Sequence, residues 1–141
     1  MIKVEEIKKA HNRIMPYIHR TPVLTNKSLN KLCGAELHFK CENFQKAGSF
    51  KIRGATNAVM LLDDKCINRG VVTVSSGNHG AALAMAVQAR NGKTYVIMPK
   101  NTPNIKVENV IRNGANIIWC EPNLQSREKT LKKVIGESGL T

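Results

Sequence analysis

The feature that most constrains the fold is an alternation of short apolar runs and helix-like stretches in the second half of the chain. After Gly70, three β-branched runs are each followed by a stretch with helical spacing. The expected strands are 71–74, 94–98 and 116–120, and the expected helices are 79–90, a segment capped by Thr102 with Pro103 at its first position, and 126–137. Because short connections between such elements produce a parallel sheet wrapped by helices, the pattern predicts an α/β fold.

The first part of the chain offers fewer elements. We expect an amphipathic helix over 3–18, a short helix over 28–33 closed by Gly34, a strand over 37–41, and a helix that begins with Ser49 as its N-cap. These elements are too few to close a second core, so we expect the three-layer fold to be incomplete. The predicted division places residues 1–66 in an N-terminal segment and residues 67–141 in a small α/β domain.

The net charge and the hydropathy of the chain limit the kinds of partner that it can bind. The chain has 22 Lys plus Arg against 10 Asp plus Glu, a formal charge of +12. Six aromatic residues and scattered basic residues argue against nucleic acid, and the excess charge favours small anions or balancing acidic sequence. No apolar run is long enough for a membrane span, and the N-terminus carries no secretory signal, so we expect a cytoplasmic protein without a membrane partner.

The four cysteines do not suggest a metal site. Cys33, Cys41, Cys66 and Cys120 lie too far apart in sequence for the paired spacing of a zinc site. In a cytosolic chain we expect free thiols, with Cys41 and Cys120 buried at the ends of apolar stretches.

The segment Gly48–Gly54 is the first place where chemistry could occur. With Ser49 as the N-cap, Lys51 lies in the first turn of a helix, where the dipole disfavours a cation. The nearby Arg53 acts in the same direction, so the surroundings favour a neutral amine, which can attack carbonyl groups. The alternative is an ordinary solvated lysine at a helix start.

The segment Ser75–Gly80 is the second such place, because it lies between a predicted strand and a predicted helix. Ligands of open α/β sheets bind outside the carboxyl ends of strands, and hydroxyl, amide and helix-start N–H groups suit a carboxylate or phosphate. The segment matches neither the dinucleotide fingerprint nor the P-loop. The alternatives are an ordinary capped loop and a histidine, His79, that serves only in packing.

Both segments resemble one known family. Residues 41–55, CENFQKAGSFKIRGA, resemble the lysine segment of fold-type II pyridoxal-phosphate enzymes, whose fold is that of the tryptophan synthase β subunit. Residues 75–80, SSGNHG, resemble a second motif of the serine racemase and threonine/serine dehydratase branch. Arg20-Thr21-Pro22, Met98-Pro99 and Cys120-Glu121-Pro122 extend the resemblance along nearly the whole chain.

The resemblance implies roles for individual residues. Lys51 would hold pyridoxal 5′-phosphate as a Schiff base and then move protons at the substrate Cα. Phe50 would pack beside the cofactor ring, and Asn78 would hydrogen-bond a ring oxygen. Ser76 would be the acid/base on the face opposite Lys51. The substrate carboxylate would lie among the residues of the second motif, Ser75, Ser76, Gly77, Asn78 and His79.

The resemblance therefore implies an ammonia-lyase (dehydratase) or racemase that acts on L-serine or L-threonine and is a homodimer at full length. It covers only the N-terminal part of the family. The chain has no Gly-Gly run to cradle a phosphate, and the carboxylate ligands of a divalent metal such as Mg²⁺ belong to the family's later half. The alternatives are a non-catalytic truncated fragment or interaction module and, less well supported by Ile52-Arg53, a β-replacement synthase.

Overall fold

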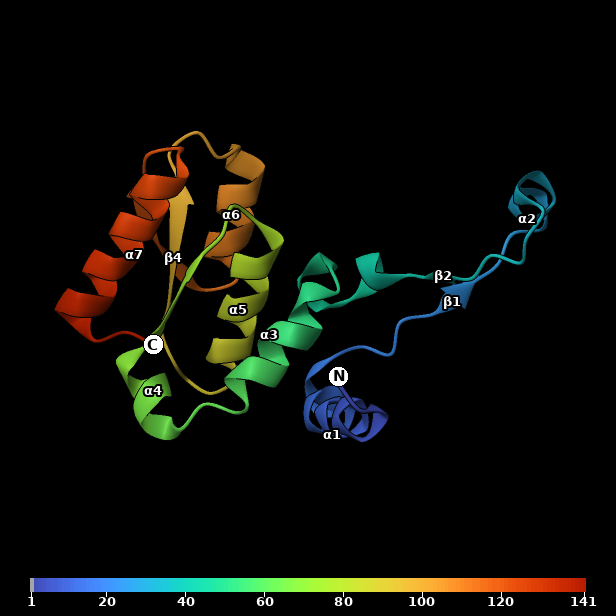
Figure 1. Cartoon of the computed structure of the whole chain (residues 1–141), viewed down its shortest axis with the longest axis horizontal. Helices are drawn as coiled ribbons and strands as arrows, with labels where there is room; N and C mark the ends of the chain where they lie inside the picture. The colour runs from blue at the N-terminus through green and yellow to red at the C-terminus, as the bar shows by residue number, and fades with distance from the viewer. Residues whose placement is uncertain (1) are drawn as a thin grey trace.

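The computed structural model describes residues 2–141. Its C-terminal half is built on a three-stranded parallel sheet in the order β3–β4–β5. Helices α5 and α6 cover one face of this sheet and α7 covers the other (Figure 1). The elements are β3 (Val71–Val74), α5 (Asn78–Gln88), β4 (Thr94–Pro99), α6 (Asn104–Arg112), β5 (Ala115–Cys120) and α7 (Leu124–Ser138). Val71 pairs with Thr94, and Thr94 pairs with Ala115. The predicted parallel sheet wrapped by helices is confirmed.

Helix α5 is the centre of the core because it is apolar on nearly every side. Ala81 packs in one buried cluster with Val96 of the sheet. On another side, Ala82 packs in a second cluster with Ile52 and Val59. The small alanine side chains let the sheet and the N-terminal half of the chain both approach α5 closely. This packing places the start of α5 beside the start of helix α3, which begins at Lys51.

The N-terminal half consists of helices and a projecting arm (Figure 1). Its elements are α1 (Val4–Ile14), a 3₁₀ turn (Met15–Tyr17), β1 (Val23–Leu24), α2 (Lys27–Cys33), β2 (Phe39–Lys40), two 3₁₀ turns (Glu42–Phe44 and Lys46–Gly48), α3 (Lys51–Val59) and α4 (Asp64–Arg69). Arg13 Nη1 donates to Asn57 Oδ1 at 2.5 Å and joins α1 to α3. The antiparallel pair β1–β2 carries α2 away from the rest of the molecule (Figure 1).

Two predicted N-caps are wrong. Helix α3 begins at Lys51 with Phe50 as its N-cap, so Ser49 lies one residue too early to cap it. Helix α6 begins at Asn104, because Pro103 has an extended ψ of 138° and stays outside the helix. The Ser49 and Thr102 hydroxyls are instead buried without a hydrogen-bond partner among residues 2–141.

Other boundaries also differ from the expectation. The N-terminal α-helix ends at Ile14, just before Pro16, and the strand expected over 37–41 is only two residues long. Helix α4 spans the expected boundary between residues 66 and 67. Asp63 caps this helix by accepting the Cys66 N–H at 2.7 Å. The predicted division into residues 1–66 and 67–141 stays a prediction.

Candidate active site

Lys51 is the first residue of α3, and its side chain is exposed. Just before it, Ala47 (φ 58°) and Gly48 (φ 67°) both adopt left-handed backbone. For an alanine this conformation costs on the order of 1 kcal/mol, a strain that is typical of functional segments. Beyond this turn Ser49 is buried while Phe50 and Lys51 are exposed. Lys51 Nζ lies 5.0 Å from the centroid of the Phe50 ring.

The Ser75–Gly80 segment joins the end of β3 to the start of α5, as the sequence predicts. Ser75 Oγ accepts the N–H groups of Gly77 at 3.3 Å and Gly80 at 3.0 Å, so this hydroxyl caps α5. A Cβ at position 80 would lie 3.0 Å from Val96 Cγ1, a tight contact, so glycine lets α5 lie close to the sheet here. Ser76 is exposed and is the hydroxyl of this loop that is available to a ligand.

One cavity brings the two segments together. It has a volume of about 330 Å³ and lies between the starts of α3 and α5; its lining is Phe50, Lys51, Arg53, Gly54, Ala55 and His79. This lining contains a lysine side chain, an aromatic ring and an imidazole, and it contains no acidic residue. The cavity thus combines groups that suit a flat, electron-poor or anionic ligand.

Gly77 and Asn78 line a different cavity. This second cavity has a volume of about 240 Å³ and is shared with Lys106 and Arg112 of α6. His79 therefore faces the Lys51 side of the loop, whereas the two preceding residues face α6. The roles in cofactor and substrate binding expected for Gly77 and Asn78 stay predictions.

The surroundings of His79 favour the neutral form of its imidazole. Burial lowers the pKa of His79, and the positive charge of Lys51 lowers it further. A neutral imidazole can donate one proton and accept another, which a protonated one cannot do. In its neutral form His79 can therefore both donate and accept a hydrogen bond in the cavity.

A partly buried ion pair between Glu42 and Arg53 supports the start of α3. The sequence did not predict this pair. Glu42 accepts two hydrogen bonds from Arg53, at 2.7 and 2.8 Å, and a third from Thr21 Oγ1 at 2.6 Å. Chiefly through the Arg53 hydrogen bond, these contacts lower the pKa of Glu42 from 4.5 to about 2. Lys40 Nζ completes the network by donating to the Thr21 carbonyl at 2.7 Å. No local pattern predicts this network, because its members come from three separate segments.

The structure is thus that of an α/β protein in which an exposed lysine and the start of α5 line one cavity, an arrangement that suits lysine–carbonyl chemistry. Comparison with known proteins specifies the family. The family model described as "Pyridoxal-phosphate dependent enzyme" matches residues 14–141, and the chain belongs to this family.

Several relatives of high sequence identity have related names. The chain is 54% identical over 133 residues to a serine racemase of Arabidopsis thaliana. This alignment covers 94% of this chain and 40% of the relative. It is 50% identical over 135 residues to a β-hydroxyaspartate dehydratase of Paracoccus denitrificans, covering 96% and 43%. The structure of maize serine racemase superimposes with a TM-score of 0.95 at 47% identity, covering 99% of this chain and 42% of that one. The chain thus spans about two fifths of the length of the relatives it matches.

Proposed function

We propose that this chain carries the cofactor-binding lysine and the substrate-carboxylate loop of a pyridoxal-phosphate-dependent enzyme that racemises or dehydrates small hydroxy amino acids such as serine and threonine. The observation that supports this most is the cavity in which Lys51 and His79 meet, since its two sides come from the two motifs shared with the family. The names of the relatives, serine racemase and β-hydroxyaspartate dehydratase, support the same substrate class.

The residues present fit pyridoxal phosphate. The cavity of about 330 Å³ falls within the size range of small-ligand sites, and its lining offers an exposed amine and an aromatic ring without a competing carboxylate. Lys51 would hold the cofactor and Phe50 would lie against it. When bound, the cofactor withdraws electrons from the substrate Cα and makes its proton acidic.

The residues of this chain then have distinct tasks. Lys51, once free as an amine, takes the proton from one face of the substrate Cα. The exposed hydroxyl of Ser76 returns a proton to the opposite face, which gives racemisation. The backbone N–H groups at the start of α5 orient the substrate carboxylate, because a helix N-terminus attracts an anion. Loss of the substrate hydroxyl instead of reprotonation gives dehydration.

A chimera tests this proposal. In it, this chain replaces the matched 133 residues of the Arabidopsis serine racemase. We expect the chimera to form D-serine or pyruvate from L-serine, and Lys51→Ala to abolish both products. The control is Lys93→Ala, because Lys93 is exposed and lies outside both cavities. An active Lys51→Ala chimera, or a folded chimera without either product, would refute the proposal.

A second variant separates the two reactions. In the same chimera, Ser76→Ala removes the hydroxyl expected to protonate one face, so D-serine formation should fall by at least about tenfold more than pyruvate formation. Ser75→Ala is a poor control because it also removes the α5 cap, whereas Ser28→Ala, on the projecting arm, is a suitable one. An equal loss of both activities in Ser76→Ala would contradict this division of roles.

The proposal also includes the compartment, the oligomeric state and the metal requirement of the enzyme. No helix within residues 2–141 is both long and apolar enough to cross a membrane. We place the enzyme in the cytoplasm, as expected from the sequence, and we expect a homodimer that uses a divalent cation; the last two expectations depend on the family resemblance.

A further inference from the structure

Arg90 follows the end of α5 and its side chain reaches across to the end of α3. Its Nη1 donates to the Val59 carbonyl at 2.8 Å and to the Leu62 carbonyl at 2.5 Å, and its Nη2 donates to Asp64 Oδ1 at 2.6 Å. The side chain of Arg90 is only 19% exposed. Val59 is the last residue of α3 and Asp64 is the first residue of α4. One guanidinium group thus joins the ends of three helices.

The two carbonyl bonds carry most of this connection. The last carbonyl groups of a helix have no partner within the helix, and a charged donor forms a stronger hydrogen bond than a neutral one. A cation at a helix C-terminus also interacts favourably with the helix dipole. The Asp64 side chain, in contrast, is 90% exposed, so its ion pair with Arg90 contributes little. Arg90 is therefore fixed to the backbone at the end of α3.

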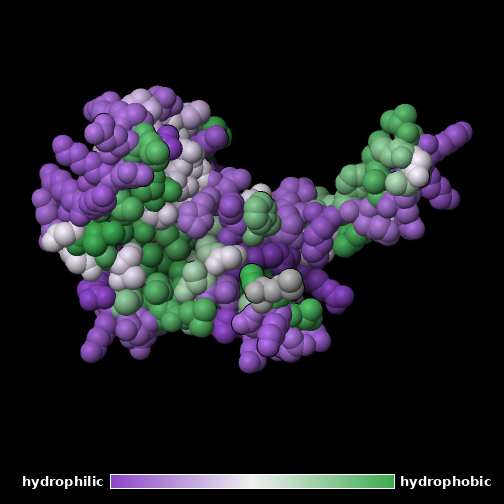
Figure 2. Space-filling view, viewed as in Figure 1, coloured by the Kyte–Doolittle hydropathy of each residue, from purple (hydrophilic) through white to green (hydrophobic). Residues whose placement is uncertain are grey.

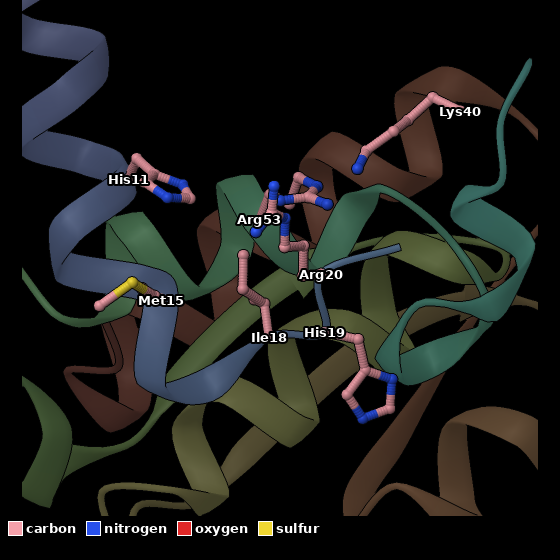
Figure 3. A pocket seen from close by; sticks show the side chains of 7 residues that line it. All are labelled: His11, Met15, Ile18, His19, Arg20, Lys40 and Arg53. Atoms are coloured by element: carbon pink, nitrogen blue, oxygen red, sulfur yellow. The ribbon is translucent and has the colours of Figure 1, made fainter. Parts of the chain in front are cut away.

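The direction of α3 depends mainly on α5. The two helices pack along their length through a buried apolar cluster that includes Ile52 and Ala82. On its α1 side, α3 borders a cavity of about 510 Å³, and Figure 3 shows His11 of α1 across this cavity from Arg53 of α3. The arm that carries α2 projects away from the helices, as Figure 2 shows. Outside the α5 side, α3 is thus only partly supported.

The sheet, in turn, holds α5. Ala81 and Ala84 of α5 are buried in one cluster with Val96 and Met98 of β4. A change at the end of α3 therefore tilts α3 and leaves the start of α5 in place. Helix α3 has nine residues, so it is about 13 Å long, and a tilt of about 5° about its end displaces Lys51 by about 1 Å. A displacement of about 1 Å at a reacting group can lower a rate by about 10²-fold.

We propose that Arg90 is a positioning residue for the reaction, because its bonds to the end of α3 set the direction of this helix and hence the place of Lys51 opposite the start of α5. This inference rests on the proposed function, in which Lys51 moves a proton and the start of α5 orients the substrate carboxylate. Arg90 lines neither cavity of the candidate site, so its effect on the reaction passes through the position of α3.

The first test measures kinetics with L-serine in the chimera. Arg90→Met keeps an unbranched stem and removes every donor. We expect kcat to fall by at least about tenfold while KM stays within about threefold of the parent, because Lys51 is displaced and the carboxylate site is not. Asp64→Asn removes only the exposed ion pair, and Val110→Ala opens a cavity in the cluster between α6 and the sheet. Both controls should keep kcat within about threefold, and thermal unfolding of each variant separates positioning from lost stability.

A second readout needs no cofactor and uses the whole 141-residue chain. Burial and the charge of Lys51 lower the pKa of His79 below its ordinary value of 6.5, and Lys51 and Arg53 are the charged groups that line the cavity with His79. Both effects weaken if α3 tilts away. NMR titration should therefore give a higher pKa of His79 in Arg90→Met than in the parent, and an unchanged one in Val110→Ala.

Arg90→Lys serves as a milder variant if Arg90→Met does not fold. It replaces the planar guanidinium by a single ammonium group, so it should change kcat and the pKa of His79 in the same directions to a smaller extent. Parental kcat in the Arg90 variant that folds, an unchanged pKa of His79, or an equal loss of kcat in Val110→Ala overturns the proposal. A parent chimera without activity refutes the proposed function instead, and the titration of His79 then decides whether Arg90 positions α3.

Discussion

Replacing Glu42 with glutamine tests whether the ion pair with Arg53 holds the lysine-bearing helix in place. The substitution keeps the shape of the side chain but removes its charge. The glutamine oxygen can accept one of the two Arg53 N–H groups, while its amide group presents a donor to the other. The pair is largely shielded, with exposed side-chain fractions of 18% for Glu42 and 28% for Arg53. A measurable loss of stability is therefore expected.

The size of the loss follows from the pKa of Glu42, which the contacts with Arg53 and Thr21 lower from 4.5 to about 2. A shift of this size corresponds to about 3 kcal/mol between the two protonation states. Because solvent screens part of the interaction, we expect Glu42→Gln to lower the free energy of unfolding by about 1–2 kcal/mol. Glu121→Gln is the control, since its pair with Lys100 is exposed on both sides and should not contribute measurably.

The assay is chemical unfolding at a series of pH values, combined with amide hydrogen exchange over residues 42–53. A carboxyl group with a lowered pKa stabilises the fold fully above its ordinary pKa of 4.5 and loses this contribution as the pH falls toward 2. The parent and Glu42→Gln should therefore differ at pH 6 and converge near pH 2, and exchange in this segment should be faster in the variant. A difference that persists unchanged at low pH would refute the reasoning.

Two further predictions concern packing and thiol chemistry. In Gly92→Ala the new Cβ lies 2.7 Å from Val87 Cγ1, so unfolding should become easier by about 1–3 kcal/mol. Gly136→Ala meets nothing within 4 Å inside α7 and should stabilise by about 0.5–1 kcal/mol; the opposite order in urea unfolding would contradict both. Burial raises the pKa of the Cys120 thiol, so iodoacetamide should label exposed Cys33 much sooner, and equal rates by mass spectrometry would exclude this.

The sheet was the most predictable part of the fold because its signals are local. The run Val71–Val74 is a strand over its full predicted length, and Asn113-Gly114 ends α6 as expected. Gly34 closes α2 in the left-handed conformation with φ 62°. In each case the local residue types are enough to indicate the backbone conformation that the structure shows.

Helix starts and long-range pairs were less predictable. Ser49 and Thr102 are good N-cap residues by type, yet each lies one position before the residue at the N-cap position of its helix. The apolar residues Val4 and Ile7 of α1 suggest a buried face, but both are exposed and only Ile14 of this helix is buried. The burial of a helix face depends on what packs against it, which the local sequence does not contain.

The candidate site was likewise predictable from local motifs but not in its long-range contacts. The motifs around Lys51 and Ser76 mark the two segments, but only the packing of α3 on α5 puts Lys51 and His79 in one cavity. The orientation of Asn78 toward α6 has no signal in the sequence. The support of α3 by Glu42 depends on a contact with Arg53, which lies beyond the reach of any local pattern.

The most direct test of the account is to identify the amine that condenses with pyridoxal phosphate. The chimera with the Arabidopsis serine racemase is incubated with the cofactor, reduced with borohydride, digested and analysed by peptide mass spectrometry. The account predicts one modified lysine, Lys51, and loss of the label in Lys51→Ala. A label on another lysine, with Lys51 unmodified, would contradict the central claim.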